Sequence, residues 1–489
     1  MINMIFKKHC RVLLALILSG VSCVVAATPT QKPNILLVLA DDLGYNDVGF
    51  NGSKDIITPN LDALAAQGTT FSEAYVAHPF CGPSRAALLT GRYPHKIGSQ
   101  FNLPIRGSFV GVPTSETFIA QVMQDAGYFT GAMGKWHLGD APQYHPNKRG
   151  FEEFYGFLGG GHNYFPAQFE KAYNERVKQG VTNIFEYLTP LEHNGKEVRE
   201  TEYITDALSR EAVNFVTKAA KNDKPFFLYL AYNAPHVPLE AKQEDMAMFP
   251  NIKDKKRKTY AGMVYAVDRG VGRIVETLKA NNQFDNTLIV FMSDNGGKLG
   301  QGASNYPLKE GKGSVYEGGF RTPMLMHWPQ QVAAGKQFEH PVLALDLYPT
   351  FAALGGASLP ANNKLDGKNI WQDLQANQNP HQDELIYVLR HRDGFSDAAV
   401  RRNEFKAVKY GKQDWQLFNI EKDISEQHDL SASNSLMLND MVAEMEKWTW
   451  DNVQPLWFHI SEEGANWRLK GMPRFDQTFK TSISSTESD

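Results

Sequence analysis

The sequence of 489 residues is longer than one typical domain, so we expect a large core and a smaller second unit. A hydrophobic content of 42%, a charged content of 21% and a formal net charge of −4 are typical of a soluble globular protein. The slightly acidic balance lacks the basic excess of a nucleic-acid-binding protein, so we expect no nucleic-acid partner.

The first 27 residues form a segment of their own. Basic residues at 7–11 precede an apolar run at 12–27 that ends in small side chains. This pattern predicts a secretory signal peptide, and therefore an exported, periplasmic or secreted protein with no stable membrane insertion after cleavage. One alternative is a membrane anchor, for which about 16 apolar residues are few. The other is a lipoprotein modified at Cys23, for which residues 20–22 are a poor lipidation box.

Two apolar runs each end in side chains that carry oxygen atoms. Residues 34–40 and 288–292 have the pattern of buried parallel strands, whose C-terminal ends are where α/β sheets place ligand sites. The candidate side chains at these ends are Asp41, Asp42, Asp294 and Asn295. Three carboxylates and one amide oxygen would suit Ca²⁺, or else Mg²⁺, better than zinc. The alternative is a pair of loops with solvated acids.

The stretch 81–91 has the pattern of a helix that begins at a reactive side chain. Pro83 suits a first turn, the alanines and leucines after it favour a helix, and Gly91 can end it. Cys81 would then lie at the anion-binding start of the helix, with Arg85 one turn away on the same face. The alternative is a buried structural cysteine.

Cysteine usage makes Cys81 unusual. Cys10 and Cys23 lie in the predicted signal segment, so the mature exported chain keeps Cys81 alone. An unpaired cysteine in an oxidising compartment requires an explanation.

Helices and strands alternate along most of the remaining chain. Periodicity predicts helices at 61–66, 116–126, 205–220, 259–281 and 346–354, and strands at 225–232 and 324–328. Residues 165–200 have no clear period and are interpreted as an insertion. A loop-rich stretch places a domain boundary near residue 375. Beyond it we expect short strands at 385–389, 398–400 and 405–410, a helix at 441–450 and a disordered last dozen residues.

Three stretches carry a family resemblance. Cys-x-Pro-Ser-Arg followed by Leu-Thr-Gly at 81–91 resembles the signature of the type I sulfatases. Residues 127–137, Gly-Tyr-x-Thr ending in Gly-Lys-x-His, are similar to the second signature of that family. Residues 305–319 resemble its Gly-Lys loop with a Tyr-Glu-Gly-Gly tail. The resemblance covers nearly all of the mature chain, more closely up to Gly319 than after it.

The resemblance implies the fold. It is an alkaline phosphatase-like α/β fold, with a large, mostly parallel central sheet flanked by helices and a smaller C-terminal α+β subdomain that carries a short antiparallel sheet. The expected division is a signal peptide at 1–27, a catalytic domain at 28–375 and a C-terminal subdomain with its tail at 376–489.

The resemblance also implies the cofactors and the site. In this family the cysteine is oxidised after translation to Cα-formylglycine by a formylglycine-generating maturation enzyme, which would explain the unpaired Cys81. One Ca²⁺ per chain is expected. The implied catalytic residues are Cys81, Arg85, Lys135, His137, His236 and Lys312. The implied metal ligands are Asp41, Asp42, Asp294 and Asn295, with Cys81 after its conversion.

The family mechanism assigns a role to each implied catalytic residue. Arg85, Lys135 and Lys312 hold the sulfate oxygens together with Ca²⁺. His137 deprotonates a formylglycine hydroxyl, and His236 with Lys312 protonates or stabilises the departing alcohol.

The expected substrate is a sulfate ester of a carbohydrate, of galactose type, because residues 294–319 resemble most the sulfatases of 4-sulfated N-acetylgalactosamine. The candidate substrate-binding residues are His162, Asn163, Tyr164, Arg390, His391 and Arg392. The first three follow a run of glycines, and the last three are a basic cluster in which arginine would pair with oxyanions. The alternatives are a flexible surface loop for the first group, and a solvated turn or an ion pair with Asp393 or Asp397 for the second.

Two rival functions stay open at this point. The first is a phosphate ester or phosphonate hydrolase on the same fold, and the second is an inactive sugar-binding protein in which Cys81 is not matured. All ten matched site positions are present, which favours an enzyme.

Overall fold

The computed structural model describes residues 31–104, 108–361, 364–392 and 395–469. The predicted signal segment, with Cys10 and Cys23, and the last dozen residues lie outside the described residues. None of the helices in the described ranges is both long and apolar enough to cross a membrane.

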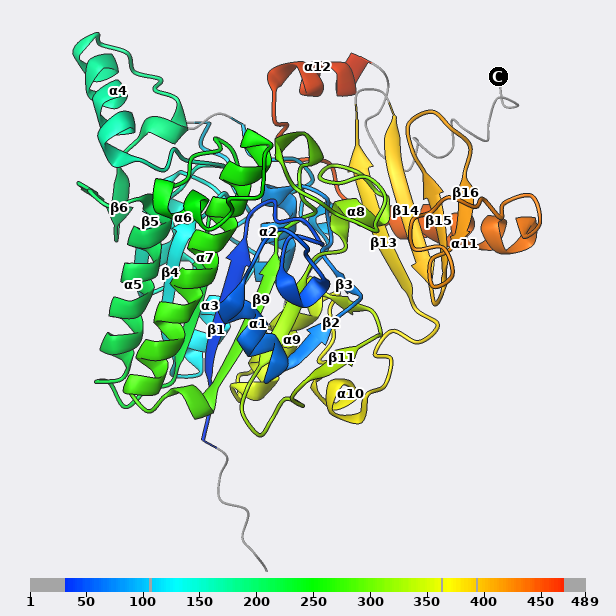
Figure 1. Cartoon of the computed structure of the whole chain (residues 1–489). Helices are drawn as coiled ribbons and strands as arrows, with labels where there is room; N and C mark the ends of the chain where they lie inside the picture. The colour runs from blue at the N-terminus through cyan, green and yellow to red at the C-terminus, as the bar shows by residue number, and fades with distance from the viewer. Residues whose placement is uncertain (1–30, 105–107, 362–363, 393–394, 470–489) are drawn as a thin grey trace, which may run out of the picture. The chain divides into compact units, whose positions relative to one another are not determined.

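Ten strands form the central sheet (Figure 1). In spatial order they are β11 (Lys336–Phe338), β2 (Thr69–Phe71), β10 (Met324–His327), β9 (Thr287–Ser293), β1 (Asn34–Ala40), β8 (Phe226–Ala231), β4 (Phe129–Lys135), β5 (Glu153–Phe157), β6 (Leu191–His193) and β7 (Lys196–Val198). The five strands from β9 to β5 are parallel, and β10, β6 and β7 are antiparallel to their inner neighbours. This arrangement confirms the predicted large, mostly parallel sheet.

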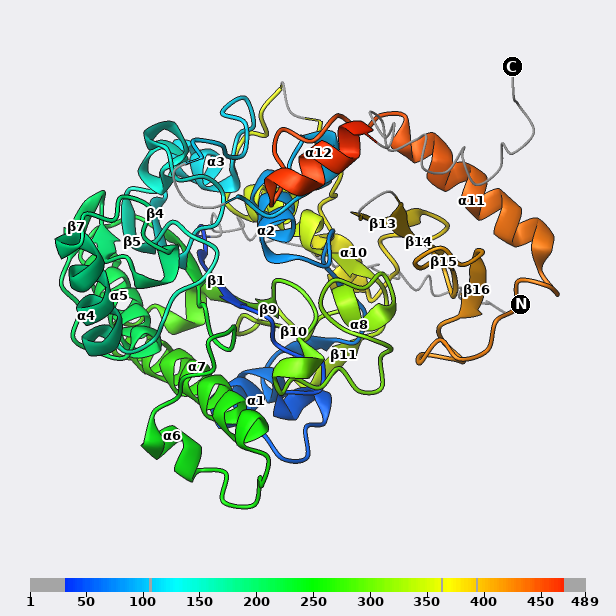
Figure 2. The ribbon, with the colours of Figure 1, turned by 90° about the horizontal axis from the view of Figure 1, so that it is seen from above.

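Helices cover both faces of this sheet, as Figure 2 shows from above. Successive residues of β1 alternate between two buried cores because strand side chains point to opposite faces. One core includes α1 (Pro59–Ala66), α5 (Ile204–Ala219) and α7 (Lys255–Ala280). The other includes α2 (Cys81–Thr90), α3 (Ile119–Asp125) and α9 (Leu347–Leu354). The central strands therefore lack a polar face, which is why they appear in the sequence as continuous apolar runs.

A second sheet of four antiparallel strands follows. It contains β13 (Leu385–His391), β14 (Ser396–Arg402), β15 (Phe405–Lys409) and β16 (Gln416–Asn419). The helix α11 (Ser435–Thr449) contacts β14 and β15, and α12 (Ser461–Leu469) ends the described chain. The short antiparallel sheet is confirmed. The predicted domain boundary near residue 375 stays a prediction, and that residue lies in α10 (Trp371–Ala376).

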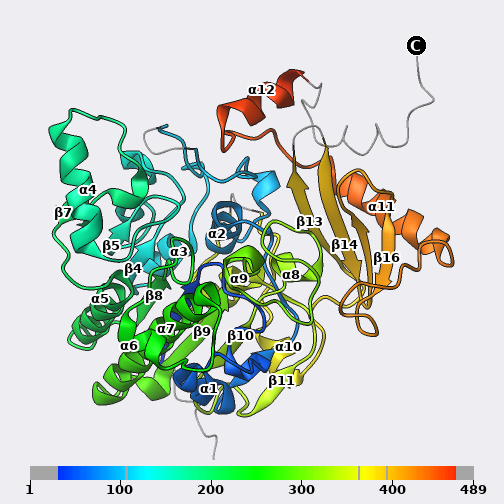
Figure 3. The same ribbon diagram turned by 45° about the horizontal axis from the view of Figure 1, so that its top comes forward.

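The segment predicted as an insertion without a clear period contains regular structure. It holds α4 (Pro166–Lys178), a 3₁₀ turn at Glu186–Leu188 and the hairpin of β6 and β7 at the sheet edge beyond β5 (Figure 3). The helix α4 buries two side chains, Pro166 and Phe169, so its sequence carries no apolar stripe from which to predict it. The smaller elements elsewhere are β3 (Ala74–Tyr75), α6 (Gln243–Ala247), α8 (Glu317–Phe320) and β12 (Val342–Leu343).

Candidate active site

The candidate site lies where the central parallel strands end. Neighbouring strands β9, β1, β8 and β4 place their C-terminal ends along one edge of the sheet. The site residues at these ends are Asp41 and Asp42 after β1, Lys135 and His137 at β4, His236 after β8, and Asp294 and Asn295 after β9. The fold thereby brings together residues as far apart in sequence as Asp41 and Asn295, as the strand-end argument predicts.

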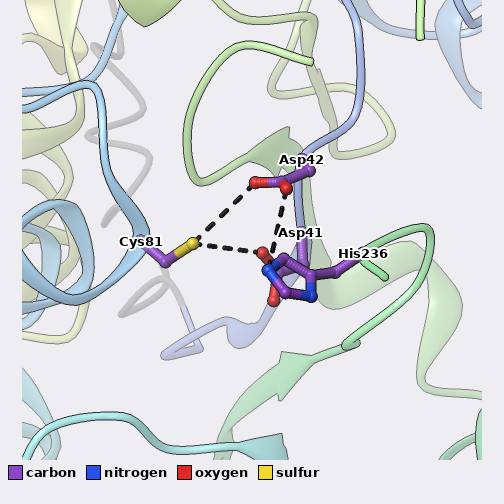
Figure 4. A group of neighbouring side chains, drawn as sticks. All are labelled: Asp41, Asp42, Cys81 and His236. Atoms are coloured by element: carbon purple, nitrogen blue, oxygen red, sulfur yellow. Dashed lines mark hydrogen bonds and ion pairs between the residues drawn. The ribbon is translucent and has the colours of Figure 1, made fainter. Parts of the chain in front are cut away.

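Cys81 begins α2, and Gly91 ends it in a left-handed conformation with φ 66°. The sulfur lies 3.4 Å from Asp41 Oδ1 and 3.8 Å from Asp42 Oδ1 (Figure 4). It also lies 3.1 Å from Lys312 Nζ. Burial, together with the Asp41 carboxylate, raises the pKa of the Cys81 thiol, despite the opposing lysines. The side chain thus faces the charged groups of the site, but the surroundings do not create a reactive thiolate.

Two cationic side chains, Arg85 and Lys135, form ion pairs with the carboxylates on one side of the sulfur. Arg85 Nε lies 2.8 Å from Asp294 Oδ2, and its Nη2 lies 3.4 Å from Asp41 Oδ2. Lys135 Nζ lies 2.6 Å from the same Asp41 oxygen. All four side chains are fully buried, so these charges act on one another with little solvent screening.

Asp42 forms the other side of the site. Its Oδ1 lies 2.7 Å from Lys312 Nζ and accepts a hydrogen bond from Asn295 Nδ2 at 2.8 Å, and its Oδ2 lies 3.7 Å from His236 Nε2. Burial opposes ionisation of Asp42, but the Lys312 ammonium and His236 hold its pKa well below the usual range. The pKa of Lys312 is raised well above its ordinary value by Asp42 and Cys81, against burial. Both groups therefore stay charged at neutral pH.

The residues implied as metal ligands fit a hard cation. Oxygen atoms of Asp41 and Asp42 lie within 4.8 Å of one another, of the Cys81 sulfur and of a His236 nitrogen. The Asn295 Oδ1 is buried and has no hydrogen-bond partner in the described part of the chain. Such an orphaned acceptor beside carboxylates is costly unless a cation or water satisfies it.

His137 follows β4 in a left-handed conformation with φ 60°, which is uncommon for a residue with a side chain. Burial and the cation of Lys135 lower its pKa well below the ordinary value, so the ring is neutral. Its Nδ1 is buried without a hydrogen-bond partner among the described residues. The ring therefore offers a proton acceptor at the edge of the site.

His236 lies between Pro235 and Pro238, each preceded by a cis peptide bond. Its Nδ1 lies 2.7 Å from the Val237 carbonyl, and burial with Lys312 lowers its pKa to about 3. The Tyr164 hydroxyl lies 2.7 Å from the carbonyl oxygens of both Asn233 and His236. The buried Tyr164 thus fixes the backbone of this loop through two hydrogen bonds.

The expectation that His162 and Tyr164 line a sugar pocket is wrong, because both side chains are 0% exposed. The His162 ring nitrogens lie 2.7 Å from the carbonyl oxygens of Asn163 and Thr189. The Tyr164 hydroxyl supports the His236 loop instead, and the His162 ring binds backbone carbonyls near Thr189. Asn163 is partly exposed, and its role in substrate binding stays a prediction.

The basic cluster on β13 is divided by the structure. Arg392 forms an ion pair with Asp397, and His391 is buried with its Nδ1 2.8 Å from the Ser396 hydroxyl. Arg392 therefore matches the alternative of an ion pair with Asp397. Arg390 also lies 3.9 Å from Asp397 Oδ2, but it donates in addition to the Gly313 carbonyl next to Lys312, and with His391 it lines a cavity of about 170 Å³.

Sequence reasoning missed two residues beside the site. Asn102 accepts a hydrogen bond from the Gly82 amide at 2.9 Å, and so fixes the first turn of α2. Tyr187 lies with its ring centroid 6.4 Å from that of His236. Neither residue belongs to a recognisable motif. Asn102 lies in a loop and Tyr187 in the 3₁₀ turn at Glu186–Leu188, and the local sequence does not reveal the course of either segment.

Comparisons with known proteins identify the family. The family described as Sulfatase matches residues 33–357, and the family described as N-sulphoglucosamine sulphohydrolase, C-terminal, matches residues 311–451. The N-acetylgalactosamine-6-sulfatase of Homo sapiens is 36% identical over 360 residues, covering 71% of this chain and 67% of its own. The uncharacterized sulfatase YdeN of Escherichia coli strain K12 is 32% identical over 450 residues, covering 79% of this chain and 75% of its own.

Solved structures agree with this assignment. The crystal structure of Ps i-CgsB in complex with k-i-k-neocarrahexaose is 72% identical, covers 92% of this chain and 100% of its own, and superposes with a TM-score of 0.91. The PsFucS1 sulfatase from Pseudoalteromonas sp. is 27% identical, covers 86% of this chain and 90% of its own, and has a TM-score of 0.73. The chain therefore belongs to the sulfatase family and is a sulfuric ester hydrolase.

Proposed function

We propose that the chain removes sulfate from a sulfated galactan of the carrageenan class, using a formylglycine at position 81 and one Ca²⁺. The observation that carries this proposal is the convergence of Arg85, Lys135 and Lys312 on acids that surround the Cys81 sulfur. Three cations in a buried site would stabilise a tetrahedral oxyanion group and the charge that develops on it. The carbohydrate class is supported by the 72% identity to a protein crystallised with a neocarrahexaose.

A formylglycine at position 81 would supply, as its hydrate, the hydroxyl that attacks sulfur. Asp41, Asp42, Asp294 and Asn295 would hold the Ca²⁺. The bound cation would polarise the sulfate oxygens. The raised thiol pKa supports this proposal, because an unmodified Cys81 would be a weak nucleophile.

The chain's own residues would then move protons on either side of the sulfate. The neutral His137, with its unpartnered Nδ1, would accept a proton from the hydroxyl at position 81. On the opposite side, the Lys312 ammonium, whose pKa is raised by Asp42, and the nearby His236 would stabilise the departing sugar oxygen. Arg85 and Lys135 would hold the sulfate oxygens, released in part from the carboxylates they contact here.

Arg390 supports a second anionic contact. The polar side chains that line its cavity besides Arg390 are those of His78, Gln100, Asn102, His391, His459 and one acid, Glu463. His78 is 1% exposed, and its Nε2 has no hydrogen-bond partner in the described ranges. We therefore assign this cavity to a further sulfate or other oxyanion on the same polysaccharide, one that pairs with the guanidinium. A polymeric substrate of this kind also agrees with the export predicted from the first 27 residues.

The phosphonate monoester hydrolase SpPMH, 20% identical with a TM-score of 0.60, shares the fold alone. The test is to measure sulfate release from carrageenan oligosaccharides, glycosaminoglycans and paired aryl sulfate and phosphate esters. Intact-peptide mass spectrometry on enzyme from a host with a maturation enzyme should give a Cys81 peptide about 18 Da lighter than the thiol form. Active enzyme whose Cys81 is wholly alkylatable would refute the formylglycine. Turnover of phosphate esters above sulfate esters would refute the sulfatase assignment.

A further inference from the structure

We propose that Phe185 and Tyr187, here called the aromatic platform, bind the sugar ring that carries the sulfate. The inference rests on the proposed carbohydrate substrate and adds the residues that recognise its apolar face. Both residues belong to the segment between α4 and β6, which lies beside the central sheet (Figure 3). No motif of the catalytic machinery includes them.

Tyr187 lies beside His236. Its ring centroid is 6.4 Å from that of His236, at an interplanar angle of 64°. His236 is the residue assigned to the departing sugar oxygen, so the sugar must pass next to it. Burial raises the pKa of Tyr187, with further effects from Glu186, Asp41 and Cys81, so its hydroxyl is a neutral hydrogen-bond donor. A partly exposed tyrosine at this place would touch the sugar attached to the sulfate.

Phe185 lies beside Tyr187 and is exposed. This side chain is 56% exposed and stacks on Tyr187 with ring centroids 4.5 Å apart and an interplanar angle of 26°. The two rings therefore stack face to face as one apolar unit at the edge of a site otherwise made of charged groups, and Phe185 is its more exposed member. A galactopyranose has one face of adjacent C–H bonds, because its O4 is axial, and this face suits an aromatic ring.

The backbone that presents the platform is fixed. The Asn163 amide donates to the Tyr187 carbonyl at 3.1 Å, and the Gly160 amide donates to Glu186 Oε1 at 2.9 Å. A Cβ at Gly161 would lie 2.4 Å from the Tyr187 hydroxyl, and one at Gly160 would lie 2.8 Å from His137 Nε2. Because Gly160 and Gly161 lack side chains, their backbone fits between the aromatic platform and His137. This backbone segment separates the platform from His137.

The experiment compares Phe185→Ala, Tyr187→Ala and Tyr187→Phe in the full-length matured enzyme. Trp450→Ala is the matched control, because Trp450 is 59% exposed at the end of α11 and belongs to no site described above. Two constants are measured for each variant: KM for a sulfated carrageenan oligosaccharide, and Ki for inorganic sulfate. The first reports sugar binding, and the second reports the catalytic centre without a sugar.

Each alanine variant should raise KM for the oligosaccharide about tenfold, as expected for the loss of one aromatic contact, and leave Ki for sulfate within about twofold. Tyr187→Phe should keep most of the affinity because the ring remains, and Trp450→Ala should match the wild type. An unchanged KM in both alanine variants would overturn the proposal. So would a rise in Ki equal to that in KM, because the turn would then support the catalytic centre. If the wild type cleaves another sulfated sugar but no galactan, the proposed function fails, and the same comparison on that sugar still decides the platform.

Discussion

Replacing Lys406 tests how the two sheets are joined. Lys406 Nζ on β15 lies 2.9 Å from Glu317 Oε1 on α8 and 2.8 Å from Glu426 Oε1, and all three side chains are fully buried. The Lys406→Met variant keeps an apolar side chain of similar length but leaves two buried carboxylates without this counterion. Removing one partner of a buried ion pair costs about 3 to 5 kcal/mol, so we expect the free energy of unfolding to fall by about 4 kcal/mol at pH 8.

The loss should depend on pH in a definite direction. Burial already raises the pKa of Glu426 to about 7, while Lys406 lowers it, so removal of the lysine must raise it further. A carboxyl whose pKa is higher in the folded than in the unfolded state stabilises the fold when protonated, and that stability is lost as the pH rises through the folded pKa. The difference between variant and wild type should therefore be smaller at pH 5.5, by about half.

Urea unfolding at pH 5.5 and pH 8 measures both numbers, since the slope against urea shows whether the transition remains cooperative. Lys412→Met, at an exposed position in the next turn, is the control and should change the free energy by less than about 0.5 kcal/mol. A Lys406→Met/Glu426→Gln double variant should recover part of the loss at pH 8. A loss that is equal at both pH values, or a double variant less stable than the single one, would contradict the electrostatic reasoning.

Two further predictions concern the site. Asp294→Asn removes a carboxylate charge that Arg85 contacts at 2.8 Å. We expect the variant to lose bound calcium, measured by elemental analysis, and its kcat to fall at least about a hundredfold. A normal calcium content would contradict the assignment of Asp294 as a metal ligand. Arg390→Ala should raise KM for a polysulfated oligosaccharide about tenfold, while KM for a monosulfated sugar stays the same. The control is Arg402→Ala, because Arg402 lies on the neighbouring β14 and forms an exposed ion pair with Asp440.

Local sequence was sufficient to predict which side chains the fold brings together at the strand ends, because each part of this group is a short pattern at the end of a regular element. Asp41 and Asp294 follow continuous apolar runs, and parallel strands bring such ends together whatever their separation in sequence. Cys81 begins a helix whose proline and terminal glycine are visible in eleven residues. The central sheet was predictable for the same reason.

Burial of single polar side chains was not predictable in this way. His162 and Tyr164 follow three glycines, a pattern equally typical of a ligand loop, yet their partners are the carbonyls of Thr189, Asn233 and His236. These partners are 27 to 72 residues away, and only the folded chain shows that they occupy the polar groups of the two side chains. Tyr187 was missed because nothing in the sequence around it indicates that it lies beside His236 in the folded chain.

The buried ion pairs of Lys406 with Glu317 and Glu426 connect the C-terminal sheet to the candidate active site. Lys312 and Glu317 are five residues apart, and this short stretch is held on both sides. The Lys312 amide donates to the Gly297 carbonyl at 3.1 Å, beside the metal-ligand candidates of β9, and its side chain reaches Cys81. The Glu317 amide and carboxylate instead contact Glu426 and Lys406 beyond the central sheet. Lys312, proposed above to bind a sulfate oxygen, is thus positioned partly by a sheet that contributes none of the proposed catalytic residues. A loop fixed at one end alone would let its ammonium move.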